Sequence, residues 1–311
     1  MPAGVGEEIP DRGVGVGLVI DCPLVKNDPC PMGFDHPDDT PGIADPKAHR
    51  NGASQVACID GKAVRALEPS VRAEAALHSP STGIVDAHAL AVSYWAECEA
   101  HEAVLLVQAE VVEVASCATG WRVVARQPDA TTTPVVCGAV VNAAGLHADR
   151  LAAMAGVDIE AWGYRHHYCK GDYFGLAPGR KVGLSRLVYP LPGASGLGIH
   201  ATLDLSGRVR FGPDTEYVDA PRYDVDPANA EAFARAVGAY LPGVDASWLV
   251  PDYAGVRPRR AAPGEGFRDF VVREESDRGA PAWVDCVGIE SPGLTAAPAI
   301  AARVRDELRG L

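Results

Sequence analysis

The chain has 311 residues, 47% of them hydrophobic and 22% charged, which is the composition of an ordinary globular protein. Its net charge of −13 argues against a nucleic-acid partner or an anionic membrane surface. No apolar run approaches the ~20 residues that cross a bilayer, so no transmembrane segment is expected. The first residues lack a secretory signal, and the eight cysteines form no metal-ligand spacing. We therefore expect free thiols, no metal site and a cytoplasmic location.

The stretch GVGVGLVID (13–21) resembles a glycine-rich phosphate loop. A dinucleotide loop follows a β-strand and opens a helix. Here the glycines precede the apolar run 18–20, and Cys22-Pro23 stops any helix. We interpret the stretch as a flexible entry into a short strand. Residues 1–55 as a whole are rich in Pro, Gly and Asp, and we predict an irregular or poorly ordered segment there.

From residue 56 the pattern changes to regular structure. A short helix begins after its cap Asp60 and ends at Pro69, and a second helix begins near Asp86. Three strands follow. The first two, 109–115 and 120–126, alternate apolar and polar residues, and the third, 134–145, is nearly all apolar, as in one buried central strand. The third leads into a helix that Gly156 closes.

The second half begins with a strand-rich block and then returns to α/β character. Several strands joined by short turns are predicted within 157–222, and a helix is predicted over 227–241. A strand followed by a helix is predicted at the end of the chain. These elements together predict an α/β (α+β) protein.

Seven segments of the chain carry a family resemblance. They are PSTGIVDAHAL, VVNAAGLHADRLA, KGDYF, LVYPLP, GLGIHATLDLSGRVRFGP, YAGVRPR and GIESPGLT. The chain resembles FAD-dependent oxidoreductases of the D-amino-acid-oxidase superfamily, most closely the L-2-hydroxyglutarate dehydrogenase/oxidase branch. The similarity runs from about Ile59 to the C-terminus. It implies a two-part fold, with an incomplete Rossmann-like FAD domain from 56–156 and 245–311 and a strand-rich substrate domain from 157–244.

One part of the family pattern is missing. Family members begin with a strand, a G-x-G-x-x-G loop, a helix and a second strand, and residues 1–58 contain none of these. That unit normally supplies N–H donors to the pyrophosphate. We therefore expect this chain to bind FAD more weakly than a relative that has the unit. If the true N-terminus lies upstream, a mitochondrial location becomes the alternative.

The resemblance places cofactor contacts in two segments. In GIESPGLT a buried strand gives way to a turn and then to a helix capped near Thr295, whose positive N-terminal end suits the negative charge of a reduced flavin. The alternative is an ordinary strand–turn–helix corner. The implied cofactor-binding residues are Gly288, Ile289, Glu290, Ser291, Gly293, Leu294 and Thr295, together with Ala144 and Gly145.

The resemblance also gives His200 and Arg257 catalytic roles. His200 lies in an alternating strand, with Thr202 on its side and Ile199 and Ala201 on the other, and an imidazole can accept a hydroxyl proton near neutral pH. The alternative is a structural histidine. Arg257 lies between Gly255 and Pro258 in a predicted stiff turn, where its guanidinium matches a substrate carboxylate.

Several further polar residues have two possible roles. Substrate contacts are predicted for Lys170, Tyr173, Tyr189 and Thr202, with core packing as the alternative for the aromatics. Arg259 and Arg260 are predicted to be solvated. His166 and His167 are adjacent and point to opposite faces of a strand, so they form no metal site.

The implied reaction is oxidation of a 2-hydroxy acid, L-2-hydroxyglutarate to 2-oxoglutarate, with FAD as cofactor and an electron acceptor that the sequence leaves unknown. Two alternatives stay open. One is another oxidase of the superfamily, acting on an amine or on glycerol phosphate. The other is a non-catalytic remnant that binds no flavin.

Overall fold

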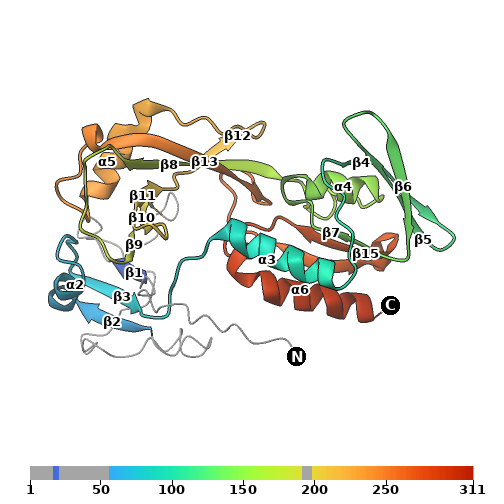
Figure 1. Cartoon of the computed structure of the whole chain (residues 1–311), viewed down its shortest axis with the longest axis horizontal. Coiled ribbons are helices and arrows are strands. Elements are labelled where there is room, and N and C mark those ends of the chain that lie inside the picture. Colours follow the sequence, from blue (N-terminus) through green and yellow to red (C-terminus); the bar gives the residue numbers. More distant parts are fainter. Residues whose placement is uncertain (1–16, 21–55, 191–197, 311) are drawn as a thin grey trace, which may run out of the picture. The chain divides into compact units, whose positions relative to one another are not determined.

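The computed structural model describes residues 17–20, 56–190 and 198–310. Its described residues form two compact units, whose elements are labelled in Figure 1. Unit 1 contains the described residues up to Asp86, Asp172–Asp214 and Asp224–Ala254. Unit 2 contains Ala87–Gly171, Thr215–Tyr223 and the described residues from Gly255 onward.

Unit 1 is built on one mixed sheet. Strand β3 pairs antiparallel with β1 and β2, and β1 pairs parallel with β9. Strand β10 lies antiparallel between β9 and β11, and β11 pairs antiparallel with the second half of β8. The strands are β1 (Gly17–Ile20), β2 (Ala57–Asp60), β3 (Ala75–Ser79), β8 (His167–Leu176), β9 (Leu187–Pro190), β10 (His200–Leu203) and β11 (Val209–Gly212). The predicted strand after the N-terminal glycines is confirmed as β1, whereas residues 13–16 and nearly all of the predicted irregular segment 1–55 lie outside the described residues.

Two helices complete unit 1. Helix α2 (Gly61–Leu67) begins as predicted, because the Asp60 carboxylate accepts the Ala63 N–H at 2.8 Å. Helix α5 (Ala230–Gly238) packs its apolar side on one face of the sheet, with the rings of Phe174 and Phe233 4.6 Å apart. That face is the hydrophobic core of unit 1, so the other face is left for polar side chains.

The compact units divide the chain differently from the predicted domains. Residues 56–86 and 245–254 belong to the strand-rich unit, because β2 and β3 extend its sheet and Val64 and Ala76 enter the same core as Phe211. Residues 157–171 and 215–223 belong to unit 2, where β12 (Glu216–Val218) pairs with the first half of β8. Strands β8 and β13 (Leu249–Arg259) each contribute to both units.

Unit 2 contains two three-stranded sheets. In the first, β15 lies between an antiparallel β14 and a parallel β7. The second is the antiparallel meander β4–β5–β6. The core includes Trp121 and Trp283, whose rings meet edge to face at 5.0 Å. The elements are α3 (Ala87–Ala100), β4 (Glu110–Cys117), β5 (Gly120–Arg126), β6 (Thr132–Cys137), β7 (Val140–Asn142), α4 (Ala148–Met154), β14 (Val271–Glu275), β15 (Ala280–Val287) and α6 (Gly293–Arg309).

One strand prediction in unit 2 is wrong. Residues 134–145 do not form a single buried strand: β6 is an edge strand of the meander and β7 belongs to the other sheet. Val135 and Val136 are 46% and 61% exposed, because only β5 pairs with β6 in the described part of the chain. The apolar composition of the segment thus arises from two short strands with different surroundings. Among the described helices, none is both long and apolar enough to cross a membrane.

The first prediction concerns Gly212 at the end of β11. Its φ is +147°, and a Cβ there would lie 2.6 Å from the Asp172 carbonyl oxygen and from the Tyr173 ring. We expect Gly212→Ala to lower the free energy of unfolding by about 1–3 kcal/mol, because backbone and ring must both shift. Gly238→Ala is the matched control in the same unit: its nearest neighbour is 3.9 Å away, and replacing a helical glycine should stabilise slightly. Urea titration of the two variants measures the difference, and equal stabilities would contradict it.

Candidate active site

A row of polar side chains crosses the face of the unit 1 sheet opposite its core. His200 on β10 and Tyr189 on β9 have ring centroids 4.3 Å apart. Ala201, between His200 and Thr202, is fully buried on the other face, as strand alternation predicts. The sheet therefore presents His200, Tyr189 and Thr202 on one side.

Tyrosines extend this row toward β8 and β13. The Tyr173 ring lies over Gly212, the cross-strand partner of His200, where the missing side chain leaves room for it. Tyr253 on β13 stacks on Tyr173 with ring centroids 4.5 Å apart and planes 10° from parallel. The face is thus a continuous aromatic and imidazole surface.

A cavity of about 490 Å³ opens beside this surface within unit 1. Its lining includes Tyr189, Thr202 and Tyr253, together with the loop 83–86 and the turn 203–206. The volume suits a small organic molecule. The tyrosine hydroxyls, the Thr202 hydroxyl and the ionic groups beside them provide the polar contacts that such a ligand needs.

The charge in this cavity is arranged around Arg210. Its Nε lies 2.5 Å from the Asp252 carboxylate, and its Nη2 lies 3.6 Å from that of Asp204. Burial raises the pKa of Asp204, but hydrogen bonds from Arg208 and Ser206 outweigh it and hold the pKa below its ordinary value. The guanidinium therefore faces two carboxylates, and its charge is already balanced.

Buried hydrogen bonding fixes the start of β10. The Tyr240 hydroxyl, at the C-terminal side of α5, donates to the Ile199 carbonyl at 2.8 Å, next to His200. Burial raises the pKa of Tyr240 far above its ordinary value, so this donor keeps its proton. Burial likewise raises the pKa of Tyr189. Tyr189 is thus a neutral hydroxyl at physiological pH.

In unit 2, β15 leads into the segment 288–295. Gly288 has a φ of +71°, and a Cβ there would lie 2.5 Å from Arg260. Helix α6 begins at Gly293 after Pro292, without a side-chain cap, rather than near Thr295. The Leu294 and Thr295 N–H groups lie in its first turn, where no intrahelical carbonyl can accept from them. They are donors for a ligand at this corner.

The segment after β7 ends at a similar corner. Asn142 is fully buried and donates through Nδ2 to the Ala148 carbonyl and to Asp285, each at 2.7 Å. Gly145, at a φ of +56°, has open space where a Cβ would be. Ala144 and Gly145 are exposed, so backbone atoms are accessible there. Since β7 and β15 are parallel, both corners follow the carboxyl ends of neighbouring strands, where α/β sheets bind ligands.

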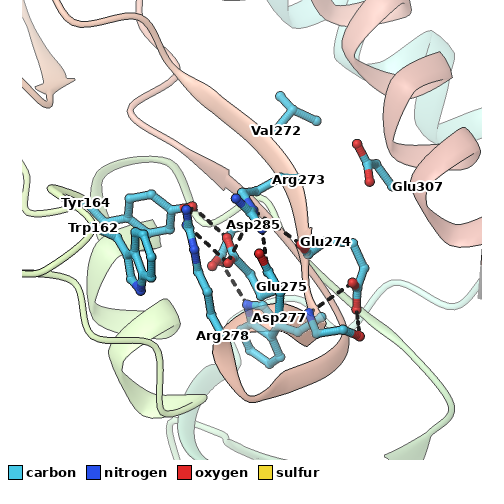
Figure 2. A network of polar contacts seen from close by, with 12 residues as sticks. Trp162, Tyr164, Val272, Arg273, Glu274, Glu275, Asp277, Arg278, Asp285 and Glu307 are labelled. Atoms are coloured by element: carbon cyan, nitrogen blue, oxygen red, sulfur yellow. Dashed lines mark hydrogen bonds and ion pairs between the residues drawn. The ribbon is translucent and has the colours of Figure 1, made fainter.

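Unit 2 also contains two fully buried carboxylates, Glu275 and Asp285, in the polar network that Figure 2 shows. Glu275 accepts the Tyr164 hydroxyl at 2.6 Å and pairs with Arg278 at 3.3 Å and Arg273 at 3.5 Å. Asp285 accepts only neutral donors, among them the Trp283 indole N–H at 2.8 Å. Its Oδ2 has no hydrogen-bond partner among the described residues. Glu275 is therefore ion-paired and Asp285 is not.

The two remaining predicted residues lie in unit 2. Lys170 on β8 is 2% exposed, and its Nζ lies 3.8 Å from Glu216 of β12. Arg257 lies within strand β13, so the predicted turn is wrong; its Nη2 donates to the Thr215 hydroxyl at 3.4 Å. Their roles toward a substrate stay predictions.

The two arginines after Arg257 are not merely solvated, contrary to expectation. Arg259 pairs with Glu290 at 3.2 Å. Arg260 donates to the carbonyls of Gly163 and Asp269 at 3.0 and 2.6 Å. Arg259 thus contacts the segment 288–295 through the Glu290 side chain, and the Arg260 side chain packs against Gly288.

Residues 20–307 match the family described as FAD dependent oxidoreductase. The chain belongs to this family. It is 30% identical over 295 residues to the mitochondrial L-2-hydroxyglutarate dehydrogenase of Arabidopsis thaliana, covering 83% of this chain and 61% of that protein. It is 23% identical over 267 residues to a glycerol 3-phosphate dehydrogenase of Caloramator mitchellensis, covering 84% of this chain and 52% of that protein.

The fold matches that of solved flavoproteins. L-α-glycerophosphate oxidase from Mycoplasma pneumoniae, a structure with FAD bound, superposes with a TM-score of 0.71 at 18% identity. The superposition covers 96% of this chain and 74% of that one. The α/β flavoprotein fold is thus confirmed, and FAD is the cofactor of the family.

The residues of unit 2 fit a flavin. The open Gly145 corner permits close backbone approach, and the first turn of α6 offers the Leu294 and Thr295 amides to the negative part of the ring. No group of three or more His, Cys, Asp or Glu side chains in the described residues could hold a metal ion.

The sequence missed Arg210, Asp252 and Tyr253 on the cavity and His166 behind Gly288. Strand alternation in RVRF could have placed Arg210 on the polar face, opposite the buried Phe211. The other three have no local signal, because β13 and the loop before β8 come to these positions through tertiary pairing.

The second prediction concerns Asp285, whose pKa burial raises to about 6, although Trp283 and Asn142 donate to it. An acid whose pKa is higher in the folded state than its ordinary 3.8 holds its proton preferentially when folded. Stability is therefore lost as the pH rises from about 4 to 6 and stays lower above that window. Asp285→Asn should remove this loss and stabilise the protein at pH 7.5 by up to about 3 kcal/mol.

Chemical denaturation between pH 4 and 8 tests this prediction. Glu275→Gln is the matched control: it also neutralises a buried carboxylate, but it removes the carboxylate that pairs with Arg278 and, together with Asp277, with Arg273. We expect that variant to be destabilised. If Asp285→Asn loses stability at pH 7.5, Asp285 is not an uncompensated charge.

Proposed function

We propose that this chain oxidises a 2-hydroxy acid with FAD, and that the substrate is L-2-hydroxyglutarate, which becomes 2-oxoglutarate. The observation that carries the proposal is the imidazole of His200 on the polar sheet face, held against Tyr189 beside a cavity lined by Thr202 and Tyr253. The 30% identity with the Arabidopsis enzyme supports this substrate.

The reaction removes a hydride and a proton from the substrate. FAD, when bound, would supply the acceptor for the hydride that leaves C2. We assign the hydroxyl proton to His200, since a positioned imidazole is an effective base near neutral pH. Tyr189, neutral because burial raises its pKa, can donate to a substrate oxygen. Loss of the C2 hydrogen as hydride and of the hydroxyl hydrogen as a proton leaves the 2-oxo acid.

The carboxylates of such a substrate need cations. The positive charge of Arg210 is compensated by the carboxylates of Asp204 and Asp252, so Arg210 attracts a further anion only weakly. We propose that Arg257 holds a substrate carboxylate through its guanidinium and that Lys170 adds positive charge. Residues 288–295, Ala144 and Gly145 hold the flavin.

Glycerol 3-phosphate oxidation is the second candidate, because a relative covering 84% of this chain is a glycerol 3-phosphate dehydrogenase. The two substrates differ in their anionic groups: one carries two carboxylates and the other a phosphate. A substrate panel therefore separates the candidates.

The third prediction tests the proposal on the whole chain. Purified protein is titrated with FAD while quenching of flavin fluorescence is followed. It is then mixed anaerobically with L-2-hydroxyglutarate, its D-enantiomer, lactate, glycerol 3-phosphate or an amino acid. We expect bleaching of the oxidised flavin absorbance with L-2-hydroxyglutarate at least about tenfold faster than with the others. Fastest bleaching with glycerol 3-phosphate would support the second candidate, and no FAD binding at any concentration would support a non-catalytic protein.

The fourth prediction concerns His200. If it is the base, His200→Ala and His200→Gln should both slow flavin reduction by about 10²–10⁴-fold while FAD affinity is retained. Gln keeps a polar side chain of similar size beside Tyr189 but cannot accept a proton near neutral pH. A structural role would instead lower the thermal stability of the Ala variant and leave the reduction rate of the Gln variant near that of the original chain. That second pattern would remove His200 from the mechanism.

A further inference from the structure

His166 is a buried histidine directly before β8. Its side chain is fully inaccessible to solvent. Nε2 accepts the Gly288 N–H at 3.0 Å, and Nδ1 lies 3.3 Å from the Leu146 carbonyl oxygen. The ring therefore bridges the segment that follows β7 and the segment that follows β15.

Asp149, in the first turn of α4, holds the histidine from behind. Its Oδ2 accepts the His166 backbone N–H at 3.0 Å, and its Oδ1 lies 3.4 Å from Nδ1. Asp149 is itself 6% exposed. Backbone and ring of His166 are thus both fixed to α4.

These contacts determine the protonation state of the ring. A backbone N–H can only donate, so Nε2 must carry a lone pair and the single proton must be on Nδ1, where it faces oxygen. Burial lowers the pKa of His166; Asp149 and the Leu146 carbonyl oppose this effect, and Arg260 and His167 add to it. These are the titratable groups and the backbone acceptor that face the ring. A second proton would place N–H against N–H at Gly288.

The backbone conformation at Gly288 is tightly constrained. It has left-handed φ, and Arg260 fills the space on its Cα, so the peptide there has one permitted arrangement. Its N–H would be a buried donor without an acceptor if the imidazole were absent. An unsatisfied buried donor costs about 1–3 kcal/mol, which is enough to favour a different path of the following turn.

We infer that neutral His166 is a positioning residue that ties together the two flavin-binding segments, 144–149 and 288–295, and that the bond from the Gly288 N–H to its Nε2 sets the conformation of the second segment for the cofactor. This inference rests on the proposed flavin-binding role of these segments. It is independent of which substrate the enzyme oxidises.

The fifth prediction is tested first without cofactor. Hydrogen exchange, followed by mass spectrometry at pH 7.5, is compared for peptides that cover residues 286–295. His166→Leu should raise their exchange rate about tenfold or more, because it removes the acceptor while keeping an apolar side chain. His166→Gln, whose amide oxygen can accept, should stay within about threefold of the original chain. His167→Leu is the matched control, since that neighbour makes no contact with Gly288 in the described structure.

The same variants are then titrated with FAD from pH 5 to 8. His166→Leu should weaken FAD affinity about tenfold or more at pH 7.5, with Gln and the His167 control near the original value. Because burial holds the folded-state pKa of His166 below its ordinary value of 6.5, an opened segment takes up a proton more readily than the closed one, so loop protection and FAD affinity of the original chain should fall together as the pH drops below 6.5. The Leu variant should lack this step.

The outcomes separate the inference from the proposed function. If His166→Leu exchanges like the His167 control, the tie to Gly288 does not hold the segment and the inference is overturned. Faster exchange with unchanged FAD affinity would overturn its role toward the cofactor. If the original chain binds no FAD at all, the proposed function fails, and the exchange comparison still decides whether His166 holds the segment.

Discussion

The arrangement of unit 2 depends on one buried hydrogen bond, from the Asn142 side-chain amide to the Asp285 carboxylate. It joins β7 and β15 at directly opposed positions near the carboxyl end of a parallel pair, and Asn142 donates a second bond to the start of α4. Two chain segments far apart in sequence therefore leave the sheet at the same level. The cost is a buried carboxyl group: burial raises its pKa, and the hydrogen bonds from Trp283 and Asn142 offset this rise only in part. A buried apolar pair would avoid this cost, but it could not hold three elements at once.

In unit 1, the arrangement of the candidate site depends on a glycine, Gly212. Gly212 leaves the room on β11 that the Tyr173 ring occupies, so the aromatic row continues from β9 to β13 without a gap. The opposite face of the same strands is a core of Phe174, Phe211 and Phe233. One face is thus the hydrophobic core, and the other carries the polar and aromatic side chains of the candidate site. The tight packing at Gly212 connects the two faces, because a side chain there would displace both the β8 backbone and the Tyr173 ring.

Periodicity in the sequence was enough to predict most elements and one side of the site. Alternation in IHATL placed His200 and Thr202 opposite Ala201, and the cap Asp60 fixed the start of α2. Periodicity failed where the pairing of strands, rather than the local sequence pattern, determines the conformation. Gly255 and Pro258 suggested a turn around Arg257, but in the described sheets β13 pairs only with β8, and a strand with one partner tolerates proline. It also failed for His166, whose contact lies 122 residues away. Nothing in adjacent sequence marks such a partner.

Across the polar groups of the site, protonation is fixed nearly everywhere. Burial keeps Tyr189 protonated, hydrogen bonds keep Asp204 ionised, and two carboxylates keep Arg210 charged. A reaction that must accept one proton and return it later needs a group whose charge can change near neutral pH. Imidazole has that property, and we propose His200 for this role. The two histidines differ in their surroundings: His166 is buried between fixed partners that permit one state, while His200 is half-buried on the polar sheet face, against the Tyr189 ring.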